Sequence, residues 1–183
     1  DVVKDEIKVR HYAKIIRDEN DRMNSHVENI LQMAQFDKKS FTENEEKVDM
    51  HDIISNAIGM MKLQTEQRGG IINFKSGASS SIINADPGFI SMVMLNLLDN
   101  ALKYTDKPPL ISIVTENLGD KLIITVNDNG IGMKPEMCKK IFEKFYRVSS
   151  GNLHNVKGFG LGLSYVKAIV TAHEGTINAQ SEL

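Results

Sequence analysis

The 183-residue chain contains no tryptophan and only one cysteine, Cys138. A single cysteine excludes an internal disulfide framework and a cysteine-rich zinc site, and it fits a reducing compartment. Neither sign of charge dominates, because the formal net charge is −2, so the composition gives no basic field that would indicate nucleic-acid binding. With 41% hydrophobic and 25% charged residues, the chain has the composition of a globular protein with one sizeable core.

The chain also lacks a long apolar run. The longest, FISMVMLNLL, is interrupted by Ser91 and Asn96 and falls well short of the ~20 residues that a membrane-spanning helix requires. No signal peptide is recognisable either. We therefore expect this stretch of protein to be soluble and to make no contact with a membrane.

Residues 1–37 contain neither glycine nor proline, which favours one long helix. Apolar residues, with one polar member, recur there in alternating steps of four and three, which is an a/d heptad seam: Val9, Ala13, Ile16, Asn20, Met23, Val27, Ile30 and Ala34. Such a stripe needs a partner, either the chain's own globular body or an intermolecular helical bundle. The narrow seam and the polar linker predicted at 38–47 favour the bundle.

From residue 48 onward the pattern changes to mixed α and β. The stretch 50–70 predicts a helix that ends near Gly69 and Gly70. Asp86 is a typical N-cap and Pro87 a typical first helical residue, and that helix is predicted to reach about Tyr104. The other expected elements are short strands at 70–75 and 81–86 around a small-residue turn, a hairpin of 110–117 and 121–128, a helix at 135–146, a flexible loop at 148–158, a closing helix at 162–175 and the start of a strand at 176–183.

Four polar residues of the helix after Pro87 share one face, because they recur at spacings of three and four: Asn96, Asp99, Asn100 and Lys103. A solvated face is one interpretation. Asparagine is a mediocre helix former, however, and an idle surface more often carries Glu, Lys or Gln. The two asparagines offer carbonyl oxygens to a hard cation such as Mg²⁺, and Lys103 offers an ammonium group to phosphate.

The stretch VNDNGIGM, residues 126–133, ends an alternating strand in Asp128, followed by Gly130 and Gly132. It can be a plain turn. Alternatively, it places a carboxylate in a cleft, where glycines let the backbone approach a planar ligand. A carboxylate only accepts hydrogen bonds, so it suits an exocyclic amine such as that of adenine.

The stretch GFGLGL, residues 158–163, follows the polar loop and opens the closing helix. Glycine-rich backbone at a helix N-terminus is a ready phosphate cradle, although glycines that allow tight packing are another explanation. The stretch is neither a Walker A loop nor a G-x-G-x-x-G fingerprint, since Leu163 stands in the last position.

Taken in order, NLLDNALKYT, DNGIGM, IFEKFYRV and GFGLGL resemble the N, G1, F and G2 boxes of the sensor histidine kinases. That family shares a superfamily with type II topoisomerases, a heat-shock chaperone and mismatch-repair ATPases. The resemblance covers about 48–183 as the catalytic ATP-binding domain, and 1–37 resembles the second helix of the dimerisation and phosphotransfer hairpin. It implies an α/β (α+β) two-layer sandwich of a mixed sheet and helices, the GHKL or Bergerat-type ATPase fold, preceded by one long coiled-coil-like helix.

The resemblance implies ATP and Mg²⁺ as cofactors. Asn96 would be the metal ligand, Asn100 would contact metal or phosphate and Lys103 the phosphates, so these three form the implied catalytic set. Asp128 would accept the adenine amine. The other implied contacts are Tyr104 beside the nucleotide, Gly130 and Gly132 at the base, Phe142, Phe145 and Arg147 at the start of a mobile lid, Gly158, Gly160, Leu161 and Gly162 along the triphosphate and, on charge alone, Lys157 near the phosphates.

The amide at Asn96 also bears on the reaction. The ATP-hydrolysing relatives carry a glutamate at the corresponding place to activate water, and an amide cannot act as that base. The chain therefore resembles the kinases of the superfamily, in which phosphoryl transfer depends mostly on positioning and charge stabilisation. The γ-phosphoryl group would pass to a histidine and then to an aspartate on the receiver domain of a response regulator.

None of the five histidines fits the family's acceptor motif, and no pair has zinc-ligand spacing: His11, His26, His51, His154 and His173. We therefore expect the acceptor on a first hairpin helix that is absent here, and one further family strand after 183. As a fragment of this kind, the chain should bind Mg-ATP without phosphorylating itself. The resemblance also implies a homodimer through the hairpin, a cytoplasmic location and a membrane anchor elsewhere in the intact protein.

Two other functions stay open. A Ser/Thr protein kinase of the anti-sigma-factor type shares the ATP-binding fold but lacks a dimerisation hairpin, so the helix at 1–37 argues against it. A non-catalytic nucleotide-sensing scaffold would keep Asn96, Asn100, Lys103 and Asp128 for binding, without transferring a phosphoryl group.

Overall fold

The computed structural model describes residues 8–10, 12–13, 16–17, 20, 41–148 and 160–183. The chain divides into two units, Asp1–Ser40 and Phe41–Leu183. In the first unit the described residues are helical, and three of their apolar side chains are exposed: Val9, Tyr12 and Ile16. The rest of the helix expected over 1–37, its seam from Met23 onward and the expected loop from 149 lie outside the described residues.

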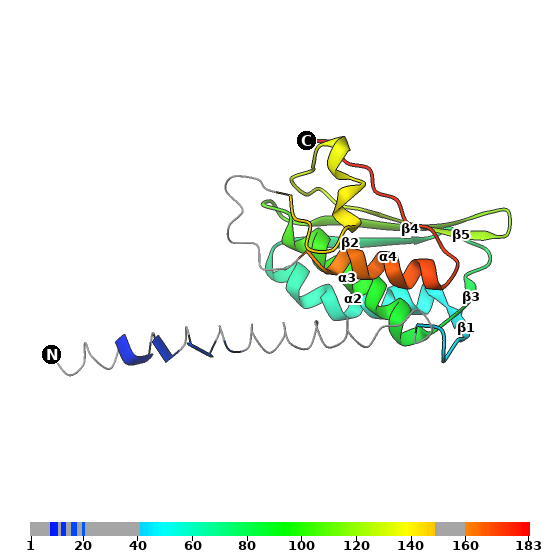
Figure 1. Cartoon of the computed structure of the whole chain (residues 1–183), viewed down its shortest axis with the longest axis horizontal. Helices are drawn as coiled ribbons and strands as arrows, with labels where there is room; N and C mark the ends of the chain where they lie inside the picture. The colour runs from blue at the N-terminus through cyan, green and yellow to red at the C-terminus, as the bar shows by residue number, and fades with distance from the viewer. Residues whose placement is uncertain (1–7, 11, 14–15, 18–19, 21–40, 149–159) are drawn as a thin grey trace. The chain divides into compact units, whose positions relative to one another are not determined.

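The second unit contains three helices, five strands and two 3₁₀ turns within its described residues. In chain order they are β1 (Glu46–Asp49), α2 (Met50–Gln67), β2 (Ile71–Ser76), β3 (Ile82–Ala85), α3 (Pro87–Lys103), β4 (Leu110–Leu118), β5 (Lys121–Asn127), η1 (Pro135–Met137), η2 (Lys140–Phe142) and α4 (Gly162–Ala172). Figure 1 shows the three helices together on one face of the main sheet. The expected two-layer α/β sandwich is confirmed.

The main sheet is mixed, with the strand order β2-β4-β5. β4 and β5 pair antiparallel across their turn, so the predicted hairpin is confirmed. β2 instead pairs in parallel with β4, and β3 pairs antiparallel with β1 in a separate two-stranded sheet. The strands expected at 70–75 and 81–86 therefore belong to different sheets. A parallel pair needs a long crossover, and the chain from β3 through α3 provides it.

The start of α3 is fixed by a side-chain cap, as the sequence predicts. Asp86 Oδ1 accepts hydrogen bonds from the N–H groups of Gly88 at 2.9 Å and Phe89 at 3.1 Å. The Asp86 N–H donates in turn to Nε2 of His173 at 3.1 Å, and Nδ1 of His173 lies 2.9 Å from the Ile169 carbonyl oxygen. His173 is thus a neutral imidazole that donates through Nδ1, and it ties the end of α4 to the beginning of α3.

The hydrophobic core lies between the helical layer and the main sheet. Its most deeply buried side chains come from α2, α3, α4 and β4: Ile54, Met94, Leu98, Leu102, Ile111, Ile113, Val166 and Ile169. At the edge of the core, the ring of Phe41 meets Phe89 and Tyr165 edge-on, with centroids 5.0 and 6.0 Å apart. Burial raises the pKa of the Tyr165 phenol above its ordinary value. Among the described residues, no helix combines the length and apolarity needed to cross a bilayer.

Three predicted segments differ in the structure. The expected linker at 38–47 includes buried Phe41 and the first residues of β1, so the globular unit begins earlier. The helix predicted at 135–146 is wrong: only η1 and η2 form there, because Cys138 alone is buried in this segment and Phe145 adopts a left-handed φ of +64°. The strand predicted at 176–183 does not form, since no ladder pairs these residues with a described strand.

The Asp86 cap gives a stability prediction. Asp86→Ala removes the oxygen that accepts from Gly88 and Phe89, so the free energy of unfolding in urea should fall by about 1 kcal/mol. Asp86→Asn keeps a side-chain oxygen at the same place and should cost far less. Equal losses in the two variants would contradict a capping role.

Candidate functional site

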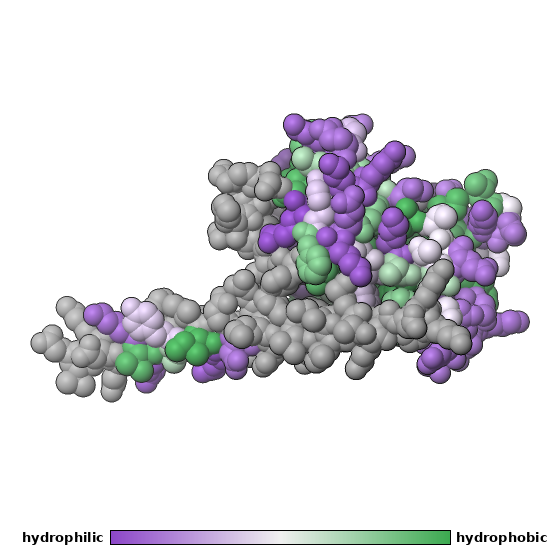
Figure 2. All heavy atoms as spheres, in the orientation of Figure 1, coloured by the Kyte–Doolittle hydropathy of each residue, from purple (hydrophilic) through white to green (hydrophobic). Residues whose placement is uncertain are grey.

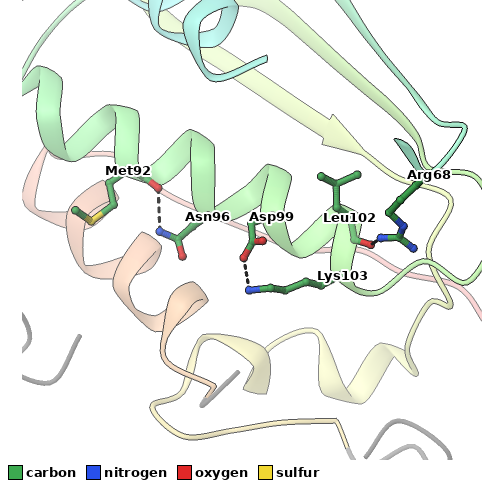
Figure 3. A network of polar contacts seen from close by, with 6 residues as sticks. All are labelled: Arg68, Met92, Asn96, Asp99, Leu102 and Lys103. Atoms are coloured by element: carbon green, nitrogen blue, oxygen red, sulfur yellow. Dashed lines mark hydrogen bonds and ion pairs between the residues drawn. The ribbon is translucent and has the colours of Figure 1, made fainter. Parts of the chain in front are cut away.

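The polar face of α3 presents an amide oxygen in a fixed orientation. Asn96, Asp99 and Lys103 project from the same side of the helix (Figure 3), and Asn100 lies one turn after Asn96. Asn96 Nδ2 donates to the Met92 carbonyl oxygen at 2.9 Å. Because only the NH₂ group of the amide can donate, this bond leaves Oδ1 as the atom that Asn96 presents. Such an oxygen is a suitable ligand for a hard cation.

The beginning of α4 lies directly against this oxygen. A Cβ atom added at Gly162, the first residue of α4, would lie 2.8 Å from Asn96 Oδ1 and 3.9 Å from Asn100 Nδ2. Glycine at this position therefore leaves room beside the amide. Leu161 at the N-cap has no group that can cap the helix, so its side chain makes no hydrogen bond to the first N–H groups of α4. The Asn96 amide oxygen and a helix N-terminus suited to anions thus lie side by side.

The C-terminal end of α3 carries the cation of the predicted set. Lys103 forms an ion pair with Asp99 one turn earlier, and the two side chains are 40% and 35% exposed. Arg68, which follows α2, donates from its guanidinium to the carbonyl oxygen of Leu102 (Figure 3) and to that of Thr105. The end of a helix leaves such carbonyls without helical partners, and a cation there also complements the helix dipole. Arg68 therefore anchors the segment that holds Lys103.

The loop after β5 is attached to this same end of α3. The Ile131 N–H donates to the Tyr104 carbonyl oxygen at 2.9 Å. Asp128 Oδ1 accepts from the Gly130 N–H at 2.8 Å, and the Asp128 side chain is otherwise exposed. One carboxylate oxygen is thus engaged within the loop, and the other can accept a hydrogen bond from a ligand.

Asn129 holds the loop from the other side. Its Oδ1 accepts from the Leu110 N–H at 2.8 Å, and its Nδ2 donates to the Pro108 carbonyl oxygen at 3.1 Å. Both functions of the amide are satisfied by the backbone at the start of β4. Asn129 therefore fixes the position of Asp128 without facing a ligand itself.

Gly132 is in contact with the C-terminal segment. Its φ is +67°, and a Cβ atom there would lie 1.8 Å from the Glu182 carbonyl oxygen. The neighbouring Met133 N–H donates to Ser181 Oγ at 2.9 Å. Glycine is therefore required at 132 both by conformation and by the approach of the chain's own backbone. Gly132, which the family resemblance places at the base, thus lies against the backbone of Glu182.

The two flanks of segment 149–159 meet across a short backbone contact. The Phe145 N–H donates to the Gly160 carbonyl oxygen at 3.0 Å, and the Phe145 side chain is 70% exposed. The ring of Phe142 packs near Lys167 of α4, with Nζ 6.0 Å from its centroid. Of the predicted residues in this region, Arg147 is exposed, and Lys157 and Gly158 lie outside the described residues.

The surface over η1 and η2 is hydrophilic (Figure 2). Exposed cations outnumber exposed acids along 134–147, with Lys134, Lys139, Lys140, Lys144 and Arg147 against Glu136 and Glu143. A locally positive surface attracts anions from solution. This part of the protein therefore favours the approach of a phosphate-bearing ligand.

Sequence reasoning missed the residues that hold the site together. Arg68 and Asn129 act through backbone atoms that are distant in sequence, so no local spacing pattern marks them. The Asn-Gly pair at 129–130 predicted a turn, but it gave no indication that Asn129 would bond to the backbone at the start of β4. Within the part of the chain that the structure describes, no three His, Cys, Asp or Glu side chains gather as a metal cluster. A cation site built on Asn96 would differ from such a cluster, because its ligand would be an amide oxygen.

Comparison with known proteins identifies the fold family. The family model described as histidine kinase-, DNA gyrase B-, and HSP90-like ATPase matches residues 85–183, which contain all four boxes. The chain belongs to this family. The resemblance to the ATP-binding domain of sensor histidine kinases is thereby confirmed.

Individual relatives agree with this family. The chain is 44% identical over 176 residues to the sensor protein RprX of Bacteroides fragilis. The aligned region covers 95% of this chain and 34% of RprX. The chain spans about a third of the length of the curated relatives it matches.

Solved structures share the fold. Full-length ShkA in complex with AMPPNP aligns with a TM-score of 0.76 at 24% identity, over 95% of this chain and 36% of that one. The histidine kinase ThkA in complex with the response regulator protein TrrA aligns with a TM-score of 0.68 at 21% identity, over 90% and 44%.

Gly132 and Gly119 make a matched pair that separates conformational strain from steric overlap. At Gly119 φ is +64° and no atom of the described residues lies within 4 Å of an added Cβ, whereas at Gly132 φ is +67° and the added Cβ would contact Glu182. Gly119→Ala should therefore cost only the left-handed penalty, about 1–2 kcal/mol. Gly132→Ala should cost clearly more in the same urea unfolding experiment. Equal costs would show that the C-terminal segment does not constrain residue 132.

Proposed function

We propose that this chain binds Mg-ATP and that, in the intact protein, it delivers the γ-phosphoryl group to a histidine and from there to an aspartate of a response-regulator receiver domain. The observation that carries the proposal is the contact of Gly162 with the oriented oxygen of Asn96. Through that contact the N box and the G2 box would together form the binding site for the metal and the phosphates. The relatives named as sensor proteins favour this function over an anti-sigma-type kinase or a scaffold.

The adenine end of the site would be formed by the loop after β5. Asp128 would accept a hydrogen bond from the exocyclic amine through the oxygen that Gly130 does not use. Tyr104 would pack beside the nucleotide from the end of α3, where the Ile131 N–H holds the loop. Asn129 would keep Asp128 in place through its two backbone bonds.

The phosphate end would be formed by α3 and α4. The donor set suits a magnesium ion and a triphosphate, because Asn96 offers an oxygen, Lys103 an ammonium group and α4 its first N–H groups. A bound Mg²⁺ would supply neutralisation of phosphate charge. Asn100 lies one turn after Asn96 and would contact metal or phosphate. Gly158, Gly160 and Leu161 would follow the phosphates, and Phe142, Phe145, Arg147 and Lys157 would belong to the lid.

The residue type at position 96 favours transfer over hydrolysis. An amide cannot take a proton from water, so Asn96 would hold ATP without activating a water nucleophile. The remaining work of the site is to position the phosphates and stabilise their charge, which is sufficient when another domain brings the acceptor. The acceptor histidine, the homodimer that would present it and the response regulator are parts of the proposal for the intact protein.

Calorimetric titration with Mg-ATP tests the nucleotide assignment directly. The unaltered chain should bind, and Asp128→Asn should bind about 10- to 150-fold more weakly, because a hydrogen bond to a charged group contributes about 1.5–3 kcal/mol. An asparagine whose oxygen stays on the Gly130 N–H would turn a donor toward the adenine amine. Asp120→Asn, in the turn between β4 and β5, is the matched charge control and should bind normally. A folded chain that binds no Mg-ATP would overturn the proposal.

A second experiment tests the absence of an acceptor. Incubation of this chain alone with γ-labelled ATP should leave no acid-labile label on the protein. The reason is that none of the five histidines fits the acceptor motif. Of the two that lie among the described residues, His51 has its Nε2 2.9 Å from Thr115 Oγ1, and His173 has both ring nitrogens engaged. Mg-ATP binding measured on the same sample shows that a negative result does not come from an empty site. An acid-labile label on the chain would contradict this prediction.

A further inference from the structure

Asp99 is the one residue on the polar face of α3 without a part in the proposed nucleotide site. It lies between Asn96 and Lys103 on that face (Figure 3), and its Oδ2 pairs with Lys103 Nζ. Both side chains are partly exposed, so each can exchange its partner for a ligand. An exposed pair of this spacing contributes little to stability, so fold stability alone gives it no clear purpose.

A carboxylate at this place has opposite effects on a metal-free and a metal-bound triphosphate. It weakens the binding of the metal-free form, because it repels the phosphate oxygens and already neutralises the ammonium group of Lys103 that would attract them. Toward a metal-bound triphosphate the effect changes sign. Mg²⁺ keeps several of its waters, and a nearby carboxylate can accept hydrogen bonds from them.

We propose that Asp99 is a specificity-determining residue that makes the site select the Mg-bound nucleotide over the metal-free nucleotide. In the ligand-free protein Asp99 holds Lys103 on the face of α3. When the metal-bound nucleotide enters, Lys103 turns to the phosphates and Asp99 accepts hydrogen bonds from water on the metal. The inference rests on the proposed nucleotide binding and adds a role that neither Asn96 nor Lys103 can fill, since neither is an anion.

The test compares two affinities for each variant. Calorimetry gives the dissociation constant for ATP with excess Mg²⁺ and with excess EDTA, and their ratio measures the preference for metal. In Asp99→Asn this preference should fall about fivefold or more, the equivalent of roughly 1 kcal/mol of charge interaction. Asp99→Ser is a second neutral variant and should show the same fall, which excludes an effect peculiar to the asparagine amide.

Asp120→Asn is the control for net charge. Asp120 lies in the turn between β4 and β5, and β5 places about 20 Å of strand between that turn and the loop that carries Asp128. The metal preference of this variant should match that of the unaltered chain. Urea unfolding of all variants shows whether each is folded at the temperature of titration.

The outcomes separate this inference from the proposed function. If the unaltered chain binds no Mg-ATP, the proposed function itself fails. If it binds and the metal preference is unchanged or increased in Asp99→Asn and Asp99→Ser, the role of Asp99 is overturned while nucleotide binding stands. A fall in metal preference in both variants and none in Asp120→Asn supports the role.

Discussion

The close approach of α4 to the polar face of α3 is the constraint on which the rest of the site depends. Gly162 lies so near Asn96 that any side chain would occupy the space beside its oxygen. The buried stripes of the two helices set this approach, since Leu98 of α3 and Val166 and Ile169 of α4 belong to one core. Because that core is close-packed, the distance between the two helices cannot drift without opening a void. Hydrophobic packing on one side of α3 therefore determines the polar geometry on the other.

The same helix is held at both ends by contacts from elsewhere in the chain. At its N-terminus the Asp86 N–H bonds to His173, the residue that follows α4, and at its C-terminus Arg68 bonds to carbonyl oxygens that the helix itself cannot pair. The loop with Asp128 is attached to Tyr104 beside that second end. α3 thus connects the two ends of the proposed nucleotide site, its own polar face and the loop that carries Asp128. A polar site that holds a charged ligand benefits from such fixed supports, because little has to be reorganised when the ligand binds.

Local signals were sufficient to predict most elements of the globular unit. Asp86 and Pro87 marked the start of α3, the alternation around Gly119 marked the hairpin, and the glycines of 158–163 marked the start of α4. The failures have identifiable causes. The segment 135–146 has helix-forming composition but buries only Cys138, so no apolar stripe stabilises a long helix. The segment 176–183 alternates as a strand does, yet a strand exists only where a neighbour pairs with it.

By itself, the sequence determined the chemistry of the site: which groups are present, in what order and on which face of which helix. Those properties follow from side-chain type and from short spacings along the chain, which the backbone geometry converts into position within one element. Only the tertiary structure decided that β2 pairs with β4, that Arg68 and Asn129 support the site and that Gly162 lies against Asn96. These are contacts between residues far apart in the chain. They arise when separate apolar faces are buried in one core, and no local pattern encodes which faces those will be.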